Sequence, residues 1–337
     1  MSKVAIVILN WNGEKFLKDF LPPLVQHTPS WAEIVVADNA STDHSTAFVK
    51  EHFPQVRIIL NDKNYGFAQG YNVALRQIDA QYYCLLNSDV EVSPHWLEPI
   101  IDFLDKEAEV AVCQPKLLSF YDKEMFEYAG AAGGFIDKYG YPFCRGRIFN
   151  TLEKDTGQYD TVADIFWATG ACMFVRAEIY HQLGGLDGDF FAHMEEIDFC
   201  WRVKNAGFRV MCCPNSTVYH VGGGTLPKKS SHKTYLNFRN NIILLCKNLP
   251  KRRLLWVFFV RFLLDNVAAV RFLFDSGVGD FAAVYRAYFS FYGSLRKNIR
   301  KRNGIKHKKV TQIYNKSIVF EYYLRKNDTF LDLNDVV

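Results

Sequence analysis

Residues 4–12, VAIVILNWN, join a continuous apolar run to a polar ending. Such a run is typical of a strand that is buried on both faces, as in a parallel sheet. Similar runs recur at 33–37, 56–60, 82–86 and 110–114, with amphipathic segments between them near 14–27, 42–52, 67–78 and 94–106. Ser93-Pro94 is expected to cap and open the last of these helices. The alternation predicts an α/β fold, with a mostly parallel, Rossmann-like central sheet and helices on both faces.

Polar clusters follow three of the predicted strands: Asn10-Trp11-Asn12, Asp38-Asn39 and Asn87-Ser88-Asp89. The carboxyl ends of parallel strands meet at one edge of a sheet, and ligands bind there. We therefore expect the three clusters on one rim. Asp38 suits the imide N–H of a uracil or thymine ring, and an Asx turn explains it equally well. Asp89 suits a divalent cation bridging two phosphates, with a simple turn as the alternative.

The segment HMEEIDFCWR, residues 193–202, places three carboxylates in four positions at the start of a predicted helix. At about 100° per residue, Glu195 shares a polar arc with Asp198 and Arg202, and the last two are spaced for an ion pair. Glu196 falls on the apolar face, where burial would raise its pKa and make it a better base. The alternative is that acidic residues simply suit the first turn of a helix.

Other sequence features limit the choice of function. His220 precedes three glycines, so it is a candidate ligand or an ordinary core histidine. There is no GxxxxGK[ST] motif and no GxGxxG at the first strand, which argues against a P-loop enzyme and a dinucleotide-binding dehydrogenase. We expect residues 116–165 to extend the sheet and form loops over the rim. Residues 195–207 are predicted to form a helix that ends at Gly207.

Charge is distributed unevenly along the chain. Of 40 lysines and arginines and 36 acidic residues in 337 positions, residues 228–309 hold 19 basic but only three acidic side chains. From about residue 226 the pattern predicts long, aromatic-rich helices, without an apolar run long enough to cross a bilayer. This tail suits an anionic surface, and packing within the protein or in a homodimer is the alternative. Eight scattered cysteines without a CxxC pair indicate buried thiols in a reducing compartment, the cytoplasm.

Taken together, seven stretches resemble the family-2 glycosyltransferases with the GT-A fold, in particular their rhamnosyltransferase-like branch. They are VAIVILNWNG, VVADNASTD, NYGFAQGYN, LLNSDVEV, TGACMFVR, GGLDGDFFAHMEEIDFCWRVKNAGFRV and VYHVGGG, in the order of the family and between residues 4 and about 224. The resemblance implies a GT-A catalytic domain over residues 1–225, followed by a helical, basic region over 226–337.

The resemblance also implies roles for individual residues. The nucleotide-diphospho-sugar donor, for example dTDP-rhamnose or a UDP-sugar, would be held by Asn10, Asn12, Asp38, Asn39, Ser41, Asn64, Gly66, Phe67, Asn72, Asn87 and Ser88. Asp89 and His220 would bind Mg²⁺ or Mn²⁺, although Asn87 stands where the family has the first Asp of its DXD motif. Glu196 matches the catalytic base, with Glu in place of the usual Asp, and Glu195 and Asp198 are the alternatives.

The implied reaction is an inverting sugar transfer to a hydroxyl of a glycan or of a polyprenyl-linked glycan, in the synthesis of a cell-surface polysaccharide. Such an enzyme would work in the cytoplasm, on the inner face of the membrane, without a nucleic-acid partner. Two other functions stay open at this point: a nucleotidyltransferase on a similar sheet, and a non-catalytic relative that binds nucleotide sugars or glycans.

Overall fold

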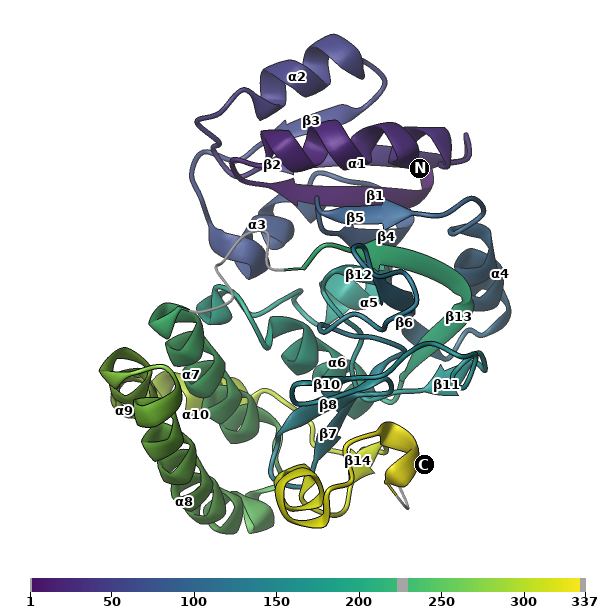
Figure 1. Ribbon diagram of the computed structural model, residues 1–337. Helices are drawn as coiled ribbons and strands as arrows, with labels where there is room; N and C mark the ends of the chain where they lie inside the picture. The colour runs from purple at the N-terminus through teal and green to yellow at the C-terminus, as the bar shows by residue number, and fades with distance from the viewer. Residues whose placement is uncertain (1, 223–229, 334–337) are drawn as a thin grey trace.

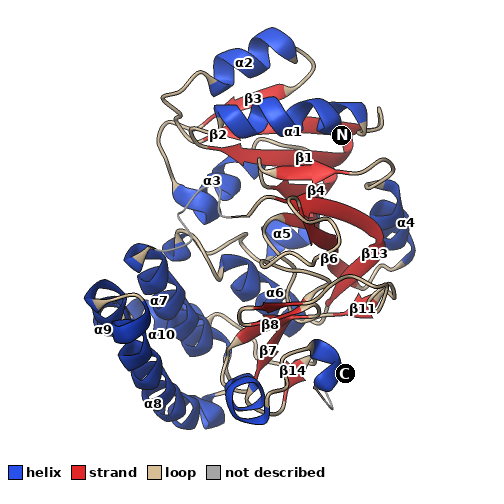
Figure 2. Ribbon diagram, viewed as in Figure 1, coloured by secondary structure: helices blue, strands red, loops and turns tan. Residues whose placement is uncertain are grey.

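The computed structural model describes residues 2–222 and 230–333, and within them the main sheet has nine strands. Their order is β11-β13-β6-β12-β4-β1-β2-β3, with β5 beside β13. Figure 2 shows the strands in red and the helices in blue. β12 pairs antiparallel with both β4 and β6, whereas β1, β2, β3 and β4 run parallel. The strands are β1 (Ser2–Asn10), β2 (Ala32–Asp38), β3 (Arg57–Leu60), β4 (Ala80–Leu86), β5 (Val90–Val92), β6 (Val110–Ser119), β11 (Ala163–Asp164), β12 (Cys172–Arg176) and β13 (Arg209–His220). The predicted Rossmann-like sheet with parallel central strands is confirmed, but the sheet is mixed, since four of its eight strand pairings are antiparallel.

Helices cover both faces of this sheet, which explains why its central strands are apolar throughout. In β1, Val4, Ile6 and Ile8 pack into one hydrophobic cluster, and Ala5 and Val7 pack into the other. The first cluster contains side chains of α1 (Glu14–Gln26), α2 (Ser45–His52) and α4 (Glu98–Lys106). The second contains side chains of α3 (Gly66–Leu75), α5 (Ala177–Gln182) and α6 (Glu195–Ala206). A strand between two helical layers must bury both rows of its side chains.

The predicted start of α4 is wrong. Ser93-Pro94 was expected to open this helix, but it begins at Glu98. The Ser93 hydroxyl donates to the carbonyl of Thr217 instead of capping a helix. His95 has a φ of +58°, which a right-handed helix cannot include. The predicted end of α6 is confirmed, since Gly207 follows it with a φ of +102°.

A second sheet of five strands replaces most of the loop expected over residues 116–165. β6 and β11 do extend the main sheet, as expected. Within the described residues, the second sheet has the order β10-β9-β8-β7-β14, from β7 (Gly134–Asp137), β8 (Pro142–Cys144), β9 (Arg147–Ile148), β10 (Thr151–Leu152) and β14 (Ile313–Tyr314). These strands have only two to four residues, which is too short for a readable hydrophobic period.

The C-terminal part is helical, as predicted. It contains α7 (Ser231–Asn248), α8 (Lys251–Asp275), α9 (Val278–Gly293) and α10 (Leu295–Asn303), followed by α11 (Ile318–Phe320), η2 (Glu321–Arg325) and η3 (Phe330–Asp332). Figure 1 shows α7 to α10 gathered below the rim of the main sheet. Among the helices of the described residues, none has the length and apolarity needed to cross a membrane. All eight cysteines are buried and unpaired, as predicted. The predicted boundary at 225/226, with Gly223 and Gly224, lies outside the described residues.

Candidate functional site

The strand ends of β1, β2 and β4 form one rim, as predicted. Asn10 is in register with Asp38, and Ile8 is in register with Leu86, directly before Asn87. The three polar clusters therefore leave the sheet at the same level. This common level follows from parallel pairing alone, because side chains in register share a height along the strands.

The first cluster on this rim is a closed hydrogen-bond network. The Asn10 amide donates to Asp38 Oδ2 at 2.9 Å and lies 3.2 Å from Ser41 Oγ. Asp38 Oδ1 accepts from the Ser41 backbone N–H at 2.9 Å, and the Asn12 N–H donates to Ser41 Oγ at 2.9 Å. Asn12 itself is exposed at the mouth of the network with a φ of +51°. The structure thus brings together Asn10, Asn12, Asp38 and Ser41.

A second group joins this cluster through Asn39. The Asn39 amide donates to the Gly66 carbonyl at 3.0 Å, and Asn64 Oδ1 accepts from the Gly66 N–H at 2.8 Å. Gly66 has a φ of +72°, and a Cβ there would lie 2.5 Å from the ring of Phe191. Only glycine fits, since both the backbone angle and the space exclude a side chain. Phe67 follows and packs edge-on against Tyr71.

Asn72 serves the fold rather than this cluster. Its Oδ1 accepts from Tyr180 Oη at 2.7 Å and from the Leu186 N–H at 3.0 Å. Its amide donates to the Leu186 carbonyl at 2.7 Å. Both ends of the side chain are therefore used to fix the segment that leads into α6, and the predicted lining role in the donor pocket has no support from these contacts.

The third cluster contains the predicted metal ligands. Asp89 Oδ1 lies 3.1 Å from His220 Nε2, and both side chains are buried. On the other side of the ring, His220 Nδ1 lies 3.3 Å from Glu127 Oε1. Burial alone would lower the pKa of His220, but the charges and hydrogen bonds of Glu127 and Asp89 outweigh it and raise that pKa to about 10. Glu127 was missed in the sequence, since nothing near EMFEYAG marks it as a partner of His220.

This cluster fits a divalent cation with two protein ligands. A carboxylate oxygen and an imidazole nitrogen are both donors that such cations accept, and Asp89 Oδ1 and His220 Nε2 lie side by side at 3.1 Å. Glu127 stands where a carboxylate orients a metal-bound histidine by accepting its second N–H. Among the described residues, no group of three or more His, Cys, Asp and Glu side chains is arranged to hold a metal ion. The remaining ligands would come from the substrate diphosphate and water.

The three carboxylates of α6 lie in different environments. Asp198 is fully buried, and its predicted ion pair with Arg202 is confirmed at 2.9 Å. It also contacts Lys247 at 2.8 Å and the Asn248 amide at 2.8 Å. Burial alone would raise the pKa of Asp198, but the positive charges of Lys247 and Arg202 keep that pKa below its usual value. Asp198 is thus a permanently charged structural group, which argues against its predicted alternative role as the base.

Glu195 and Glu196 lack such partners. One oxygen of each, Oε2, is buried with no hydrogen bond to any described residue. Burial and the charge of Glu196 raise the pKa of Glu195 well above its usual value. Burial also raises the pKa of Glu196, to about 7. Ionisation of one carboxyl therefore disfavours ionisation of the other. Glu195 is the more buried of the two, and Glu196 is half-buried.

One backbone turn joins Glu196 to the rim. A Cβ added at Gly170 would lie 4.0 Å from Glu196 Cβ and 3.1 Å from the ring of Phe67. The next residue, Ala171, accepts a hydrogen bond from the Asn87 N–H at 2.9 Å. The turn at 170–171 thus has Glu196 on one side and the Asn87-Ser88-Asp89 cluster on the other. Sequence position alone did not predict this contact.

The backbone directly before α6 is strained. Phe191, His193 and Met194 have φ angles of +65°, +70° and +72°, a region that costs about 1 kcal/mol or more for each such residue. α7 opposes this strain with Asn240, which is fully buried. The Asn240 amide nitrogen lies 2.8–2.9 Å from the carbonyl oxygens of residues 190, 192 and 193. On the other side, the N–H groups of residues 67 and 68 donate to the Phe191 carbonyl.

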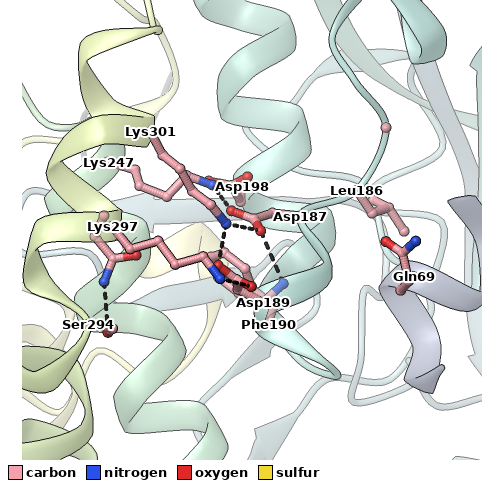
Figure 3. A network of polar contacts seen from close by, with 12 residues as sticks. Gln69, Leu186, Asp187, Asp189, Phe190, Asp198, Lys247, Ser294, Lys297 and Lys301 are labelled. Atoms are coloured by element: carbon pink, nitrogen blue, oxygen red, sulfur yellow. Dashed lines mark hydrogen bonds and ion pairs between the residues drawn. The ribbon is translucent and has the colours of Figure 1, made fainter.

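An ion-pair network holds the same segment from α7 and α10 (Figure 3). Lys247 contacts Asp187 at 2.6 Å, and Lys301 bridges Asp187 and Asp189. Lys297 reaches Asp189 at 2.6 Å. Burial would raise the pKa of Asp187, but Lys247 and Lys301 hold it far below its usual value. These lysines belong to the basic tail, for which the sequence predicted an anionic partner outside the protein. Part of the positive charge of the tail is instead neutralised by Asp187 and Asp189 within the protein.

Solved structures define the class of this fold. GalNAc-T7 with UDP, GalNAc and Mn²⁺ superposes with a TM-score of 0.59 at 17% identity, over 74% of this chain and 49% of that one. TarS 1-349 of S. aureus with UDP superposes with a TM-score of 0.52 at 15% identity, over 97% and 93%. The chain therefore has the predicted GT-A fold, and it spans about half the length of the GalNAc-T7 chain.

Sequence comparison identifies the family. The model described as "Glycosyl transferase family 2" matches residues 5–184, more than half of the chain. The protein belongs to this family and is a glycosyltransferase. Its relatives include the low-salt glycan biosynthesis hexosyltransferase Agl10 of Haloferax volcanii, 21% identical over 72% of this chain and 75% of that one. Another is the N-acetylglucosaminyl-diphospho-decaprenol L-rhamnosyltransferase of Mycobacterium tuberculosis, 24% identical over 64% and 75%. The predicted resemblance to the rhamnosyltransferase-like branch is confirmed.

Proposed function

We propose that the protein transfers a hexose, with inversion, from a nucleotide-diphospho-sugar to a hydroxyl of a glycan or lipid-linked glycan in cell-surface polysaccharide synthesis. The observation that carries the proposal is the environment of Glu196. This half-buried carboxyl has an oxygen without a hydrogen bond and a pKa of about 7. It lies beside the backbone turn at 170–171, which contacts the rim where Asn87 and Asp89 lie. The names of the relatives support a rhamnosyl or other hexosyl donor, such as dTDP-rhamnose or a UDP-sugar.

The donor's nucleoside would lie against the cluster of Asn10, Asn12, Asp38 and Ser41. Asp38 retains lone pairs beyond the two hydrogen bonds that it accepts, which suits the N–H of a pyrimidine ring. Asn39 and Asn64 are used to hold Gly66, so they shape this pocket rather than contact the base. The diphosphate would then extend toward Asn87, Ser88 and Asp89, which leave β4 at the same level.

Glu196 would act as the general base. Its ionised carboxylate accepts the proton of the acceptor hydroxyl while the acceptor oxygen forms a bond to the anomeric carbon. The bond from that carbon to the diphosphate breaks on the opposite face, and the nucleoside diphosphate leaves with the bonding electrons. Configuration at the anomeric carbon is thereby inverted. Burial and the charge of Glu196 disfavour ionisation of Glu195 beside it, which favours a state in which only Glu196 carries charge when the reaction begins.

Asp89 and His220 would hold a divalent cation, Mg²⁺ or Mn²⁺, with Glu127 orienting the histidine. Such a cation stabilises the negative charge that develops on the leaving diphosphate. The Mn²⁺ in the GalNAc-T7 structure supports this assignment.

We also propose a division of labour along the chain. Residues 1–225 would bind the donor and carry the base, whereas 226–337 would fix the segment before α6 through residues such as Asn240 and Lys301. A cytoplasmic location agrees with the eight free thiols.

Thermal unfolding with a panel of nucleotide-diphospho-sugars, with and without Mn²⁺, tests this function. We expect one donor to raise Tm in a Mn²⁺-dependent way and to be consumed when an acceptor glycan is added. Preference for nucleoside triphosphates over nucleotide sugars would favour a nucleotidyltransferase. Stabilisation by a donor without transfer to any acceptor or to water would favour a non-catalytic relative.

A further inference from the structure

The outer face of α8 is apolar from Leu255 to Phe274 and is covered by no described residue. Its exposed side chains recur at three- and four-residue spacing, and the most exposed are 48–86% accessible: Leu255, Trp256, Phe259, Phe262, Leu263, Val267, Val270 and Phe274. The charged Arg261 and Asp265 lie on the opposite face and are buried in an ion pair. A helix of a soluble domain normally shows the reverse arrangement, with its charges outward.

α9 continues this face. Phe289 is 77% exposed, and Val278 and Tyr292 lie on the same side of the helix. The two helices join there, because Tyr285 Oη donates to Asn266 Oδ1 at 2.8 Å and Phe262 packs edge-on against Tyr288. Figure 1 shows α8 and α9 side by side on the outside of the molecule, far from β2 and β3. We call this continuous face, formed by the exposed apolar residues of α8 and α9, the α8–α9 surface.

Cations border the α8–α9 surface. Lys251 and Arg252 are exposed at the start of α8, Arg286 is exposed on α9, and Arg296 and Arg300 are exposed on α10. The only acidic residues in these three helices are Asp265, Asp275 and Asp280. The first is buried against Arg261, and the second is paired with Arg271. The edge of the surface therefore carries a clear excess of positive charge.

We propose that the α8–α9 surface binds an anionic lipid membrane, with its aromatic and aliphatic side chains in the interface and the bordering cations at the head groups. Apolar area and basic charge together are what interfacial helices use. A second copy of this chain is a poorer partner. In a symmetric dimer the same surface faces itself, so the positive edges of both copies would be brought together without acidic partners.

The α8–α9 surface is linked by side-chain contacts to the segment directly before α6. Tyr235 on α7 donates to Ser290 Oγ on α9 at 2.9 Å, and Lys297 on α10 contacts Asp189 at 2.6 Å. Membrane binding would thus place the segment before Glu195 and Glu196 close to the lipid surface. This consequence rests on the proposed function, because it brings a lipid-linked acceptor to the base. The membrane contact itself does not depend on catalysis.

Vesicle flotation of the full chain tests the proposal. At low salt we expect the protein to float with vesicles of 30 mol% phosphatidylserine in phosphatidylcholine, at least tenfold more than with phosphatidylcholine alone. The triple variant Trp256→Ser, Phe259→Ser, Phe289→Ser should lose at least tenfold of this binding. Because these side chains are all more than half exposed, the variant should keep its fold and Tm. The matched control Leu60→Ser, Tyr121→Ser, Leu331→Ser changes three exposed apolar residues elsewhere and should bind as wild type.

Three results would overturn the membrane assignment. The wild-type protein could fail to float with anionic vesicles at low salt. The triple variant could float as well as the control variant. The wild-type chain could be a dimer by light scattering that only the triple variant converts to a monomer, which would assign the surface to a second copy. Donor binding measured on the same samples separates this proposal from the proposed function, since the triple variant should keep it unchanged.

Discussion

Asn240 is expected to control catalysis without touching substrate. The Asn240 amide has two N–H groups, and they serve carbonyls of residues 190, 192 and 193, in a segment with three strained φ angles. Asn240→Ala removes both donors and leaves buried carbonyls unpaired. Each lost hydrogen bond costs roughly 1–2 kcal/mol, so the loss of two destabilises the native conformation of this segment by about 2–4 kcal/mol. The strain at Phe191, His193 and Met194, of similar size, is then no longer opposed.

We therefore expect kcat of Asn240→Ala to fall by about 30- to 1000-fold, because 1.4 kcal/mol corresponds to a factor of ten. The Kd of the donor should stay within about threefold, since the cluster around Asp38 is untouched. Steady-state kinetics and calorimetric donor binding measure both values. Hydrogen exchange should show faster exchange at residues 190–195, with little change in the central strands.

Asn237→Ala is the matched control, one turn earlier on the same helix and only half-buried. It carries the same change in helix propensity without the three carbonyl contacts, and it should keep wild-type kcat. Equal losses of kcat in both variants would refute the positioning role. So would an Asn240→Ala enzyme whose kcat is unchanged while exchange at 190–195 stays slow.

Three further predictions follow from the site. Burial raises the pKa of Glu196 from 4.5 to about 7. The folded state therefore favours the protonated carboxyl, and the stability that this gives is complete below pH 4.5 and is lost as pH rises through 7. Glu196→Gln should thus raise Tm relative to wild type at about pH 8 and much less at about pH 5. Lys301→Met should lower the free energy of unfolding in urea by about 1–2 kcal/mol, because it leaves Asp187 and Asp189 with fewer partners, whereas the exposed Lys306→Met should change it little. Asp89→Asn should weaken Mn²⁺-dependent stabilisation by the donor at least tenfold, and Glu91→Gln, a neighbour paired with Lys123, should not.

The sequence predicted the main sheet well because buried strands leave a strong local signal. VAIVIL and its counterparts are apolar on both faces, and their polar endings meet on one rim for geometric reasons alone. The sheet of β7 to β10 left no such signal, because each strand is short and β14 joins it from about 170 residues further along the chain. The helix start predicted at Ser93-Pro94 was wrong for a similar reason. The Ser93 hydroxyl donates a hydrogen bond to the carbonyl of Thr217, which is far away in the sequence.

The sequence predicted the main residues of the site, but it did not predict the distant residues that hold them in place. The helical period separated Glu196 from Asp198 and anticipated the Asp198–Arg202 pair. It placed Glu195 among the explained acids, however, and the structure buries Glu195 more deeply than Glu196. Partners such as Glu127, Asn240 and Lys301 come from distant segments and follow from tertiary packing. The pair Asn240-Asn241, directly before the apolar run IILLC at 242–246, was a signal in the sequence that could have pointed to this contact.

The proposed mechanism depends most directly on Glu196 as the base. Single-turnover transfer by Glu196→Gln should be at least 100-fold slower than by wild type, with the donor Kd within about twofold. Glu195→Gln, a matched change at the preceding position, should retain far more activity, because burial and the charge of Glu196 raise the pKa of Glu195 well above its usual value and make it a poorer candidate for the ionised base. Wild-type transfer by Glu196→Gln, or loss of transfer in Glu195→Gln alone, would contradict the assignment.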